Sequence, residues 1–187
     1  MVVVLKTSTV KANSVSSRNG WAAFMAIEFH KNRAVWLLLS VAIIVLDYAT
    51  KYVASTSLDY GQSIAVMPMF NWTLLHNYGA AFSFLSDQGG WQRWFFAGVA
   101  FLVSGGLLGW LLLSKQVSTW ERLAIALVLG GALGNLYDRM AYGYVIDFIH
   151  VYYDVYHFPA FNLADTAISI GAAILVIDSL FLTRRTQ

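Results

Sequence analysis

Four long apolar stretches, separated by polar or mixed segments, dominate the pattern of the chain. Each holds about twenty mostly apolar residues, the number that a helix needs to cross roughly 30 Å of hydrocarbon. The stretches cover residues 34–54, 91–114, 120–140 and 162–183. This pattern predicts an all-α membrane protein with four transmembrane helices, which form one domain over residues 34–187.

The segments outside these stretches differ in kind. Residues 1–33 mix Ser, Thr, Asn and Lys with an apolar patch that is too short to span, and we expect a cytoplasmic tail there. Phe70, Trp72 and Leu74 recur with a period of two, which predicts a short strand on the outer surface. Residues 142–161 are rich in Tyr, Phe and His, and we expect them to form an aromatic outer loop.

Composition and charge agree with a membrane protein and indicate its orientation. The chain is 58% hydrophobic and 12% charged, with a mean hydropathy of +0.60, which is unusual for a soluble domain. Basic residues gather at the cytoplasmic ends of spans, and nine of the twelve fall on the side of the two termini. We therefore expect both termini in the cytoplasm. The nine are Lys6, Lys11, Arg18, Lys31, Arg33, Lys115, Arg122, Arg184 and Arg185.

The sequence excludes several kinds of chemistry. It contains no cysteine, which rules out disulfides, thiolate metal sites and a cysteine nucleophile. It has no His-Glu-x-x-His or Gly-x-Ser-x-Gly motif and no glycine-rich phosphate loop or basic nucleic-acid patch. We therefore expect no metal, no cofactor and no nucleic-acid partner. Ser83 with His76 lacks an orienting group, and we expect His150 and His157 at the membrane interface.

Three carboxylates from separate parts of the chain are expected at a similar depth, in the outer third of the membrane: Asp47, Asp138 and Asp165. An ionisable residue inside a span costs a few kcal/mol, so each needs a role. Lys51 follows Asp47 by one helical turn, and Arg139 is next to Asp138. We expect these two acids to form ion pairs that tie helices together.

Asp147 and Asp165 differ because neither has a basic residue within four positions and both have apolar neighbours. Asn162 is placed to cap the last helix, with Asp165 at its third position, where the helix dipole favours a negative charge. If the two acids meet, Asp165 should be the more acidic, and Asp147, in the loop after the third span, should keep the proton. Such a pair can activate water against a carbonyl. The alternative is a helix cap and an unrelated loop acid.

Five motifs occur together in an order that resembles the bacterial lipoprotein signal peptidases, the signal peptidase II family. The resemblance covers the chain from about residue 34 onward. It implies an aspartic endopeptidase that removes the signal peptide of a diacylglyceryl-modified prolipoprotein by cutting before the lipidated cysteine, and it implies sensitivity to globomycin. The motifs are Asp-Tyr-Ala-Thr-Lys at 47–51, Asn-Tyr-Gly-Ala-Ala-Phe-Ser at 77–83, Gly-Gly-Ala-Leu-Gly-Asn-Leu-Tyr-Asp-Arg at 130–139, Val-Ile-Asp-Phe at 145–148 and Phe-Pro-Ala-Phe-Asn-Leu-Ala-Asp at 158–165.

The resemblance also assigns roles by position. It implies that Asp147 and Asp165 are the catalytic pair and that a small outer β-sheet cradles the substrate. Tyr48, where glutamine is common, and His150, where an acid is frequent, depart from the family pattern. The positions that shape the site or hold substrate are Asp47, Lys51, Asn77, Gly131, Asn135, Asp138, Arg139, Asn162 and Ala164.

These inferences define an expected setting for the protein. We expect a monomer that spans the bacterial inner membrane several times, contacts membrane lipid, and acts on lipid-modified prolipoprotein signal peptides with a site toward the outer face. Two alternatives remain open from the residues. One is a small proton-coupled transporter, since carboxylates in spans also mark ion paths. The other is a membrane scaffold without enzymatic activity.

Overall fold

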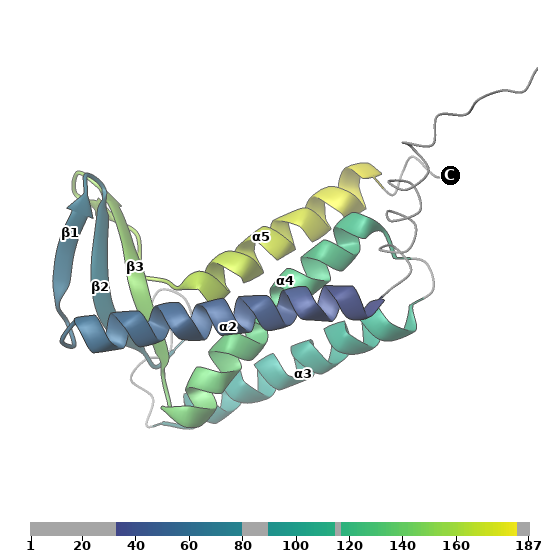
Figure 1. Cartoon of the computed structure of the whole chain (residues 1–187), viewed down its shortest axis with the longest axis horizontal. Coiled ribbons are helices and arrows are strands. Elements are labelled where there is room, and N and C mark those ends of the chain that lie inside the picture. The colour runs from purple at the N-terminus through teal and green to yellow at the C-terminus, as the bar shows by residue number, and fades with distance from the viewer. Residues whose placement is uncertain (1–32, 80–89, 115–116, 183–187) are drawn as a thin grey trace, which may run out of the picture. The chain divides into compact units, whose positions relative to one another are not determined.

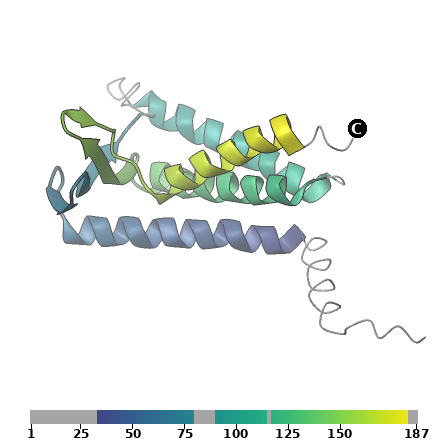
Figure 2. The same cartoon turned by 90° about the horizontal axis from the view of Figure 1, so that it is seen from above.

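The computed structural model of the chain describes residues 33–79, 90–114 and 117–182. Except for Arg33, the expected cytoplasmic tail lies outside the described residues, as does Ser83. The described part is mostly helical, with a small antiparallel sheet at one end of the helices (Figures 1 and 2).

The four predicted helices are present, with ends close to those expected. They are α2 (Arg33–Ser57), α3 (Trp91–Leu113), α4 (Thr119–Ala141) and α5 (Leu163–Ile177), and a π-helical turn, η2 (Asp178–Leu182), continues α5. Ser118 caps α4 through a capping box with Glu121, which fixes the start of this helix at Thr119.

Three of the described helices are long and apolar enough to cross a membrane: Val35–Ser57, Trp91–Leu113 and Leu163–Leu180. Helix α4 has a similar length, but polar residues such as Asn135, Asp138 and Arg139 lower its hydropathy. It packs against α2, α3 and α5, so its polar side chains are shielded by the other helices. Close packing depends on small residues, because a Cβ at Gly130 would lie 2.8 Å from the Ser40 carbonyl oxygen.

The sheet has the order β1-β2-β3-β4, with all neighbours antiparallel. The strands are β1 (Ser63–Met67), β2 (Phe70–Asn77), β3 (Val145–Tyr153) and β4 (Tyr156–His157). The strand predicted around Phe70, Trp72 and Leu74 is confirmed as β2. The expected aromatic loop is wrong, because much of it forms β3 and β4, and Asp147 therefore lies on a strand. The β-branched and aromatic run of β3 is the signal for a strand.

The sheet is fixed to the helices by a small apolar core at the end of α2. Ala54 and Leu58 of α2 pack with Leu74 of β2 and with Ile146 and Phe148 of β3. Asp147 lies between the last two of these residues in sequence. Successive side chains of a strand point to opposite faces. Ile146 and Phe148 point into the apolar core, so Asp147 between them points the other way, toward the C-terminal end of α4 and the start of α5.

Candidate active site

Asp165 is positioned by the cap of α5. Asn162 is the N-cap residue, and its Oδ1 accepts a hydrogen bond of 2.9 Å from the Asp165 amide. In return, the backbone N–H of Asn162 donates to Asp165 Oδ2 at 3.3 Å. This capping box confirms the predicted helix start and fixes the Asp165 carboxylate beside the positive end of the helix dipole.

Asp147 lies on β3, opposite Leu75 of β2, and its side chain is 3% exposed. Its Oδ1 accepts a 2.7 Å hydrogen bond from Asn162 Nδ2, and its Oδ2 accepts a 3.0 Å bond from Asn77 Nδ2. Burial, and then the neighbouring charge of Asp165, raise the pKa of Asp147 to about 7, against the opposing effect of the two amide donors. The group therefore holds a proton more readily than an ordinary aspartate.

The structure brings the two acids together through Asn162, which hydrogen-bonds to both carboxylates. Both acids also line one cavity of about 820 Å³. Among the described residues, neither forms a salt bridge. One protonated and one ionised carboxyl facing the same space can serve as acid and base for a single water.

Arg139, which sequence reasoning placed beside Asp138, lines the same cavity. Its guanidinium donates to the Asn135 carbonyl oxygen at 3.3 Å and to the Gly79 carbonyl oxygen at 3.2 Å. The guanidinium carbon also lies 5.5 Å from the centre of the Phe96 ring. Asp147 and Asp165 have no basic residue near them in sequence, but the fold brings Arg139 to the wall of their cavity.

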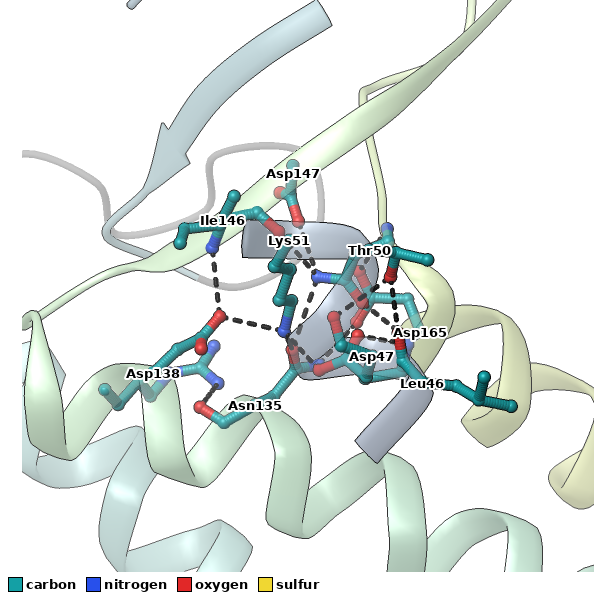
Figure 3. A network of polar contacts seen from close by, with 12 residues as sticks. Leu46, Asp47, Thr50, Lys51, Asn135, Asp138, Ile146, Asp147 and Asp165 are labelled. Carbon is teal, nitrogen blue, oxygen red and sulfur yellow. Dashed lines mark hydrogen bonds and ion pairs between the residues drawn. The ribbon is translucent and has the colours of Figure 1, made fainter. Parts of the chain in front are cut away.

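Lys51 of α2 is the centre of a buried polar network that reaches Asn135 and Asp138 of α4 (Figure 3). Its Nζ lies 2.7 Å from Asp47 Oδ2 and 2.8 Å from Asp138 Oδ2, and the lysine is 2% exposed. The predicted pair of Asp47 with Lys51 is confirmed. The expected pair of Asp138 with Arg139 is wrong, because adjacent side chains on a helix point in different directions.

The two acids of this network also bind the backbone beside each member of the proposed pair. Asp47 Oδ1 accepts a 2.9 Å hydrogen bond from the amide of Ala164, the residue before Asp165. Asp138 Oδ2 accepts a 3.2 Å bond from the amide of Ile146, the residue before Asp147. The network therefore connects α2 and α4 to the two chain segments that carry the paired acids.

Gly131 and Asn77 occupy supporting positions that the resemblance also assigned. A Cβ on Gly131 would collide with the Ala164 carbonyl oxygen, so glycine is required where α4 meets the start of α5. Asn77, at the end of β2, donates to Asp147 and accepts through its Oδ1 from the Gly79 amide at 3.0 Å. Both therefore act on the shape of the site.

The cavity wall includes residues to which sequence reasoning assigned no role, although Tyr78, Val145 and residues 158–161 lie within the five motifs. Periodicity could not find them, since they come from several places: the strands, the turns at Tyr60 and Tyr78, the segment before α5, and α5 itself. Strand alternation and helical spacing show which side is buried, but they do not show which side faces a cavity. The members are Tyr60, Leu75, Tyr78, Val145, Phe158, Pro159, Ala160, Phe161, Thr166, Ile168, Ser169 and Ile170.

The histidines take separate places. His76 lines the cavity and stacks on Tyr144, with ring centres 3.9 Å apart. His150 and His157 lie on β3 and β4, where a ring nitrogen of one is 3.2 Å from a ring nitrogen of the other. Within the described residues, no group of three or more His, Cys, Asp or Glu is placed to hold a metal ion.

The chain is similar in sequence and in structure to known membrane proteins of bacteria. The profile of a family described as signal peptidase (SPase) II matches residues 39–181. A lipoprotein signal peptidase of Acinetobacter baumannii is 57% identical over 158 residues, which are 84% of this chain and 90% of that protein. One of Pseudoalteromonas translucida is 54% identical over 149 residues, 80% of this chain and 90% of its own length. A bacterial membrane enzyme solved by the in meso method at 2.3 Å is similar in structure, with a TM-score of 0.73 and 32% identity over 82% of this chain and 92% of the other.

Proposed function

We propose that Asp147 and Asp165 are the catalytic pair of this chain, which belongs to the signal peptidase II family and removes signal peptides from lipoproteins. The observation that carries the proposal is the shared contact with Asn162, which hydrogen-bonds to both carboxylates at the wall of one cavity. In this arrangement the protein is an aspartic endopeptidase.

The hydrogen bonds favour different protonation states for the two acids. Asp165 accepts two donors at the start of α5, from Asn135 Nδ2 at 2.7 Å and from the Asn162 amide at 3.3 Å, which suits an ionised carboxylate. Asp147 is buried, and its pKa of about 7 suits a protonated one. Asp165 is thus the general base and Asp147 the general acid.

The reaction follows from these states. Asp165 takes a proton from water as the water oxygen bonds to the carbonyl carbon of the scissile peptide. Asp147 then gives its proton to the leaving nitrogen as the carbon–nitrogen bond breaks. The proton on Asp165 passes back to Asp147, which restores the starting state. No covalent enzyme intermediate is formed.

The substrate part of the proposal concerns the bond before a diacylglyceryl-modified cysteine. The aromatic and aliphatic residues on the cavity wall, among them Phe158, Phe161 and Ile168, suit an apolar ligand beside the polar pair. A lipid-modified cysteine stays in the outer leaflet, so its peptide bond lies near the membrane surface. The family resemblance adds globomycin as an inhibitor of the same site.

The topology part of the proposal adds α4 as a fourth span, shielded from lipid by the other three helices. Four spans place both termini on one side, and the basic residues near the span ends favour the cytoplasm. The sheet and the acid pair then face the outside of the inner membrane. We propose that the protein works there as a monomer.

Cleavage of a lipidated precursor in detergent tests the proposed pair. Asp147→Asn and Asp165→Asn should each lower turnover by at least about 100-fold, because each removes one proton-transfer group. Asp154→Asn is the matched control, since it makes the same change at an exposed position of the β3–β4 turn. Turnover near that of the wild type in either of the first two variants would overturn the assignment.

A further inference from the structure

We propose that Lys51 is a positioning residue that acts on Asp165 through the side-chain amide of Asn135. The inference rests on the proposed function, because it concerns the charge state of the general base. Lys51 is 2% exposed and does not line the cavity that holds Asp147 and Asp165. Its hydrogen-bonded path to Asp165 runs through the side chain of Asn135.

The chain of contacts is short and has a fixed direction. Lys51 Nζ donates to Asn135 Oδ1 at 3.0 Å, and Asn135 Nδ2 donates to Asp165 Oδ1 at 2.7 Å. A lysine ammonium has donors and no acceptor, whereas an asparagine amide has an oxygen on one side and a donor on the other. The ammonium therefore selects the orientation in which the amide oxygen faces Lys51 and the amide nitrogen faces Asp165.

The surroundings of Lys51 hold this orientation. The ammonium has three donors, and it contacts three acceptors: Asp47, Asp138 and the Asn135 oxygen. Asn162 Nδ2 adds a second donor to the same Asn135 oxygen, at 3.3 Å. Rotation of the Asn135 amide would place its nitrogen against the ammonium, with both groups as donors, and its oxygen against the Asp165 carboxylate.

An amide between the two charges suits a general base better than a direct ion pair would. A carboxylate bound directly to an ammonium is held in its ionised form and accepts a proton less readily. Through Asn135, the carboxylate keeps a strong donor without a cation on its oxygen. The two acids beside Lys51 form ion pairs with it, so the ammonium sets the amide orientation without pairing directly with Asp165.

Loss of Lys51 should therefore lower kcat and leave KM nearly unchanged. Lys51→Met alone would leave Asp47 and Asp138 facing each other without a cation, so the informative variant also changes both acids to asparagine. Such neutral replacements of buried ion networks are often tolerated. We expect the triple variant Asp47→Asn, Lys51→Met, Asp138→Asn to fold, to keep KM within about threefold, and to lose about 10- to 100-fold in kcat, as for one hydrogen bond to a charged group.

A double-mutant cycle separates this role from a general structural one. Asn135→Leu removes the amide and leaves the ion pairs of Lys51 in place. If Lys51 acts through Asn135, adding Asn135→Leu to the triple variant should lower kcat little further than the larger of the two separate kcat losses. Melting temperature measured on the same samples shows whether each variant is folded.

Two results would overturn the inference. One is a folded triple variant with kcat within about threefold of the wild type. The other is losses that multiply in the cycle, since independent effects on activity multiply. Failure of this inference is distinct from failure of the proposed function: in the first case Asp147→Asn and Asp165→Asn remain inactive, and in the second they turn over precursor.

Discussion

Replacement of Asp147 by asparagine should stabilise the folded protein, and the gain should grow with pH. The pKa of this carboxyl is raised from 3.8 to about 7, mainly by burial. The folded protein therefore binds more protons than the unfolded chain between about pH 4 and pH 7, and stability falls as pH rises through this window. An asparagine carries no such cost, because it stays neutral at every pH.

The magnitude follows from the difference between the two pKa values. The folded-state value lies roughly three pH units above 3.8, and each unit corresponds to about 1.4 kcal/mol. The ionisation cost is then about 4 kcal/mol at about pH 8 and about 1.5 kcal/mol at about pH 5. Asparagine also loses one acceptor oxygen facing Asn77 or Asn162, at a cost of about 1 kcal/mol that does not depend on pH. Between the two pH values, the variant should gain about 2.5 kcal/mol relative to the wild type.

Thermal unfolding in detergent at both pH values measures this gain. For a chain of this size, about 2.5 kcal/mol corresponds to roughly 5–10 °C, so the melting temperature of Asp147→Asn minus that of the wild type should increase by this amount from about pH 5 to about pH 8. Asp154→Asn, the exposed control, should change the melting temperature by less than about 2 °C at either pH. A difference between Asp147→Asn and the wild type that does not vary with pH would refute the buried, proton-holding carboxyl.

Other substitutions test the packing, the buried network and the sheet. Gly131→Ala should lower stability by about 1–3 kcal/mol, because its Cβ would meet backbone, whereas Gly109→Ala, with nothing within 4 Å of its added Cβ, should unfold no earlier than the wild type. Asp138→Asn should reduce yield and melting temperature, because it removes one of two carboxylates from a buried ammonium, and a stable but inactive variant would contradict this role. Burial and then the charge of His157 lower the pKa of His150, so the β3–β4 hairpin should lose stability as pH falls below 6.5. Amide hydrogen exchange of the hairpin should then become less protected, and this loss of protection should be smaller in His157→Asn. Protection that does not vary with pH would contradict the prediction.

The helices were predictable because lipid imposes a length and a composition on any segment that crosses it. The start of α5 was also predictable, because the chemistry of a cap is local: Asn162 and Asp165 are three residues apart, and the structure joins them as expected. For the same reason the predicted pair of Asp47 with Lys51, one turn apart on α2, is confirmed. Each of these features depends on residues close together in sequence.

The features that sequence reasoning missed depend on long-range contacts. Asp138 pairs with Lys51 of another helix and not with its neighbour Arg139, because only packing decides which helix faces it. We expected a loop where the structure has β3. The partner strand β2 lies about seventy residues earlier, so no short hairpin turn marks the pair in the sequence. The contact of Asn162 with Asp147 likewise depends on how β3 meets α5. The sequence showed which acids were unusual but not the groups that hold them.

The central claim is that Asp147 and Asp165 hold one proton between them, mainly on Asp147. Infrared difference spectroscopy of the protonated carboxyl band, titrated from about pH 5 to about pH 9 in wild type and Asp147→Asn, tests it most directly. We predict one band that is lost as pH rises through about 7 in the wild type and is absent from the variant. A band of the same size in Asp147→Asn, or no protonated carboxyl in the wild type at about pH 6, would contradict the claim.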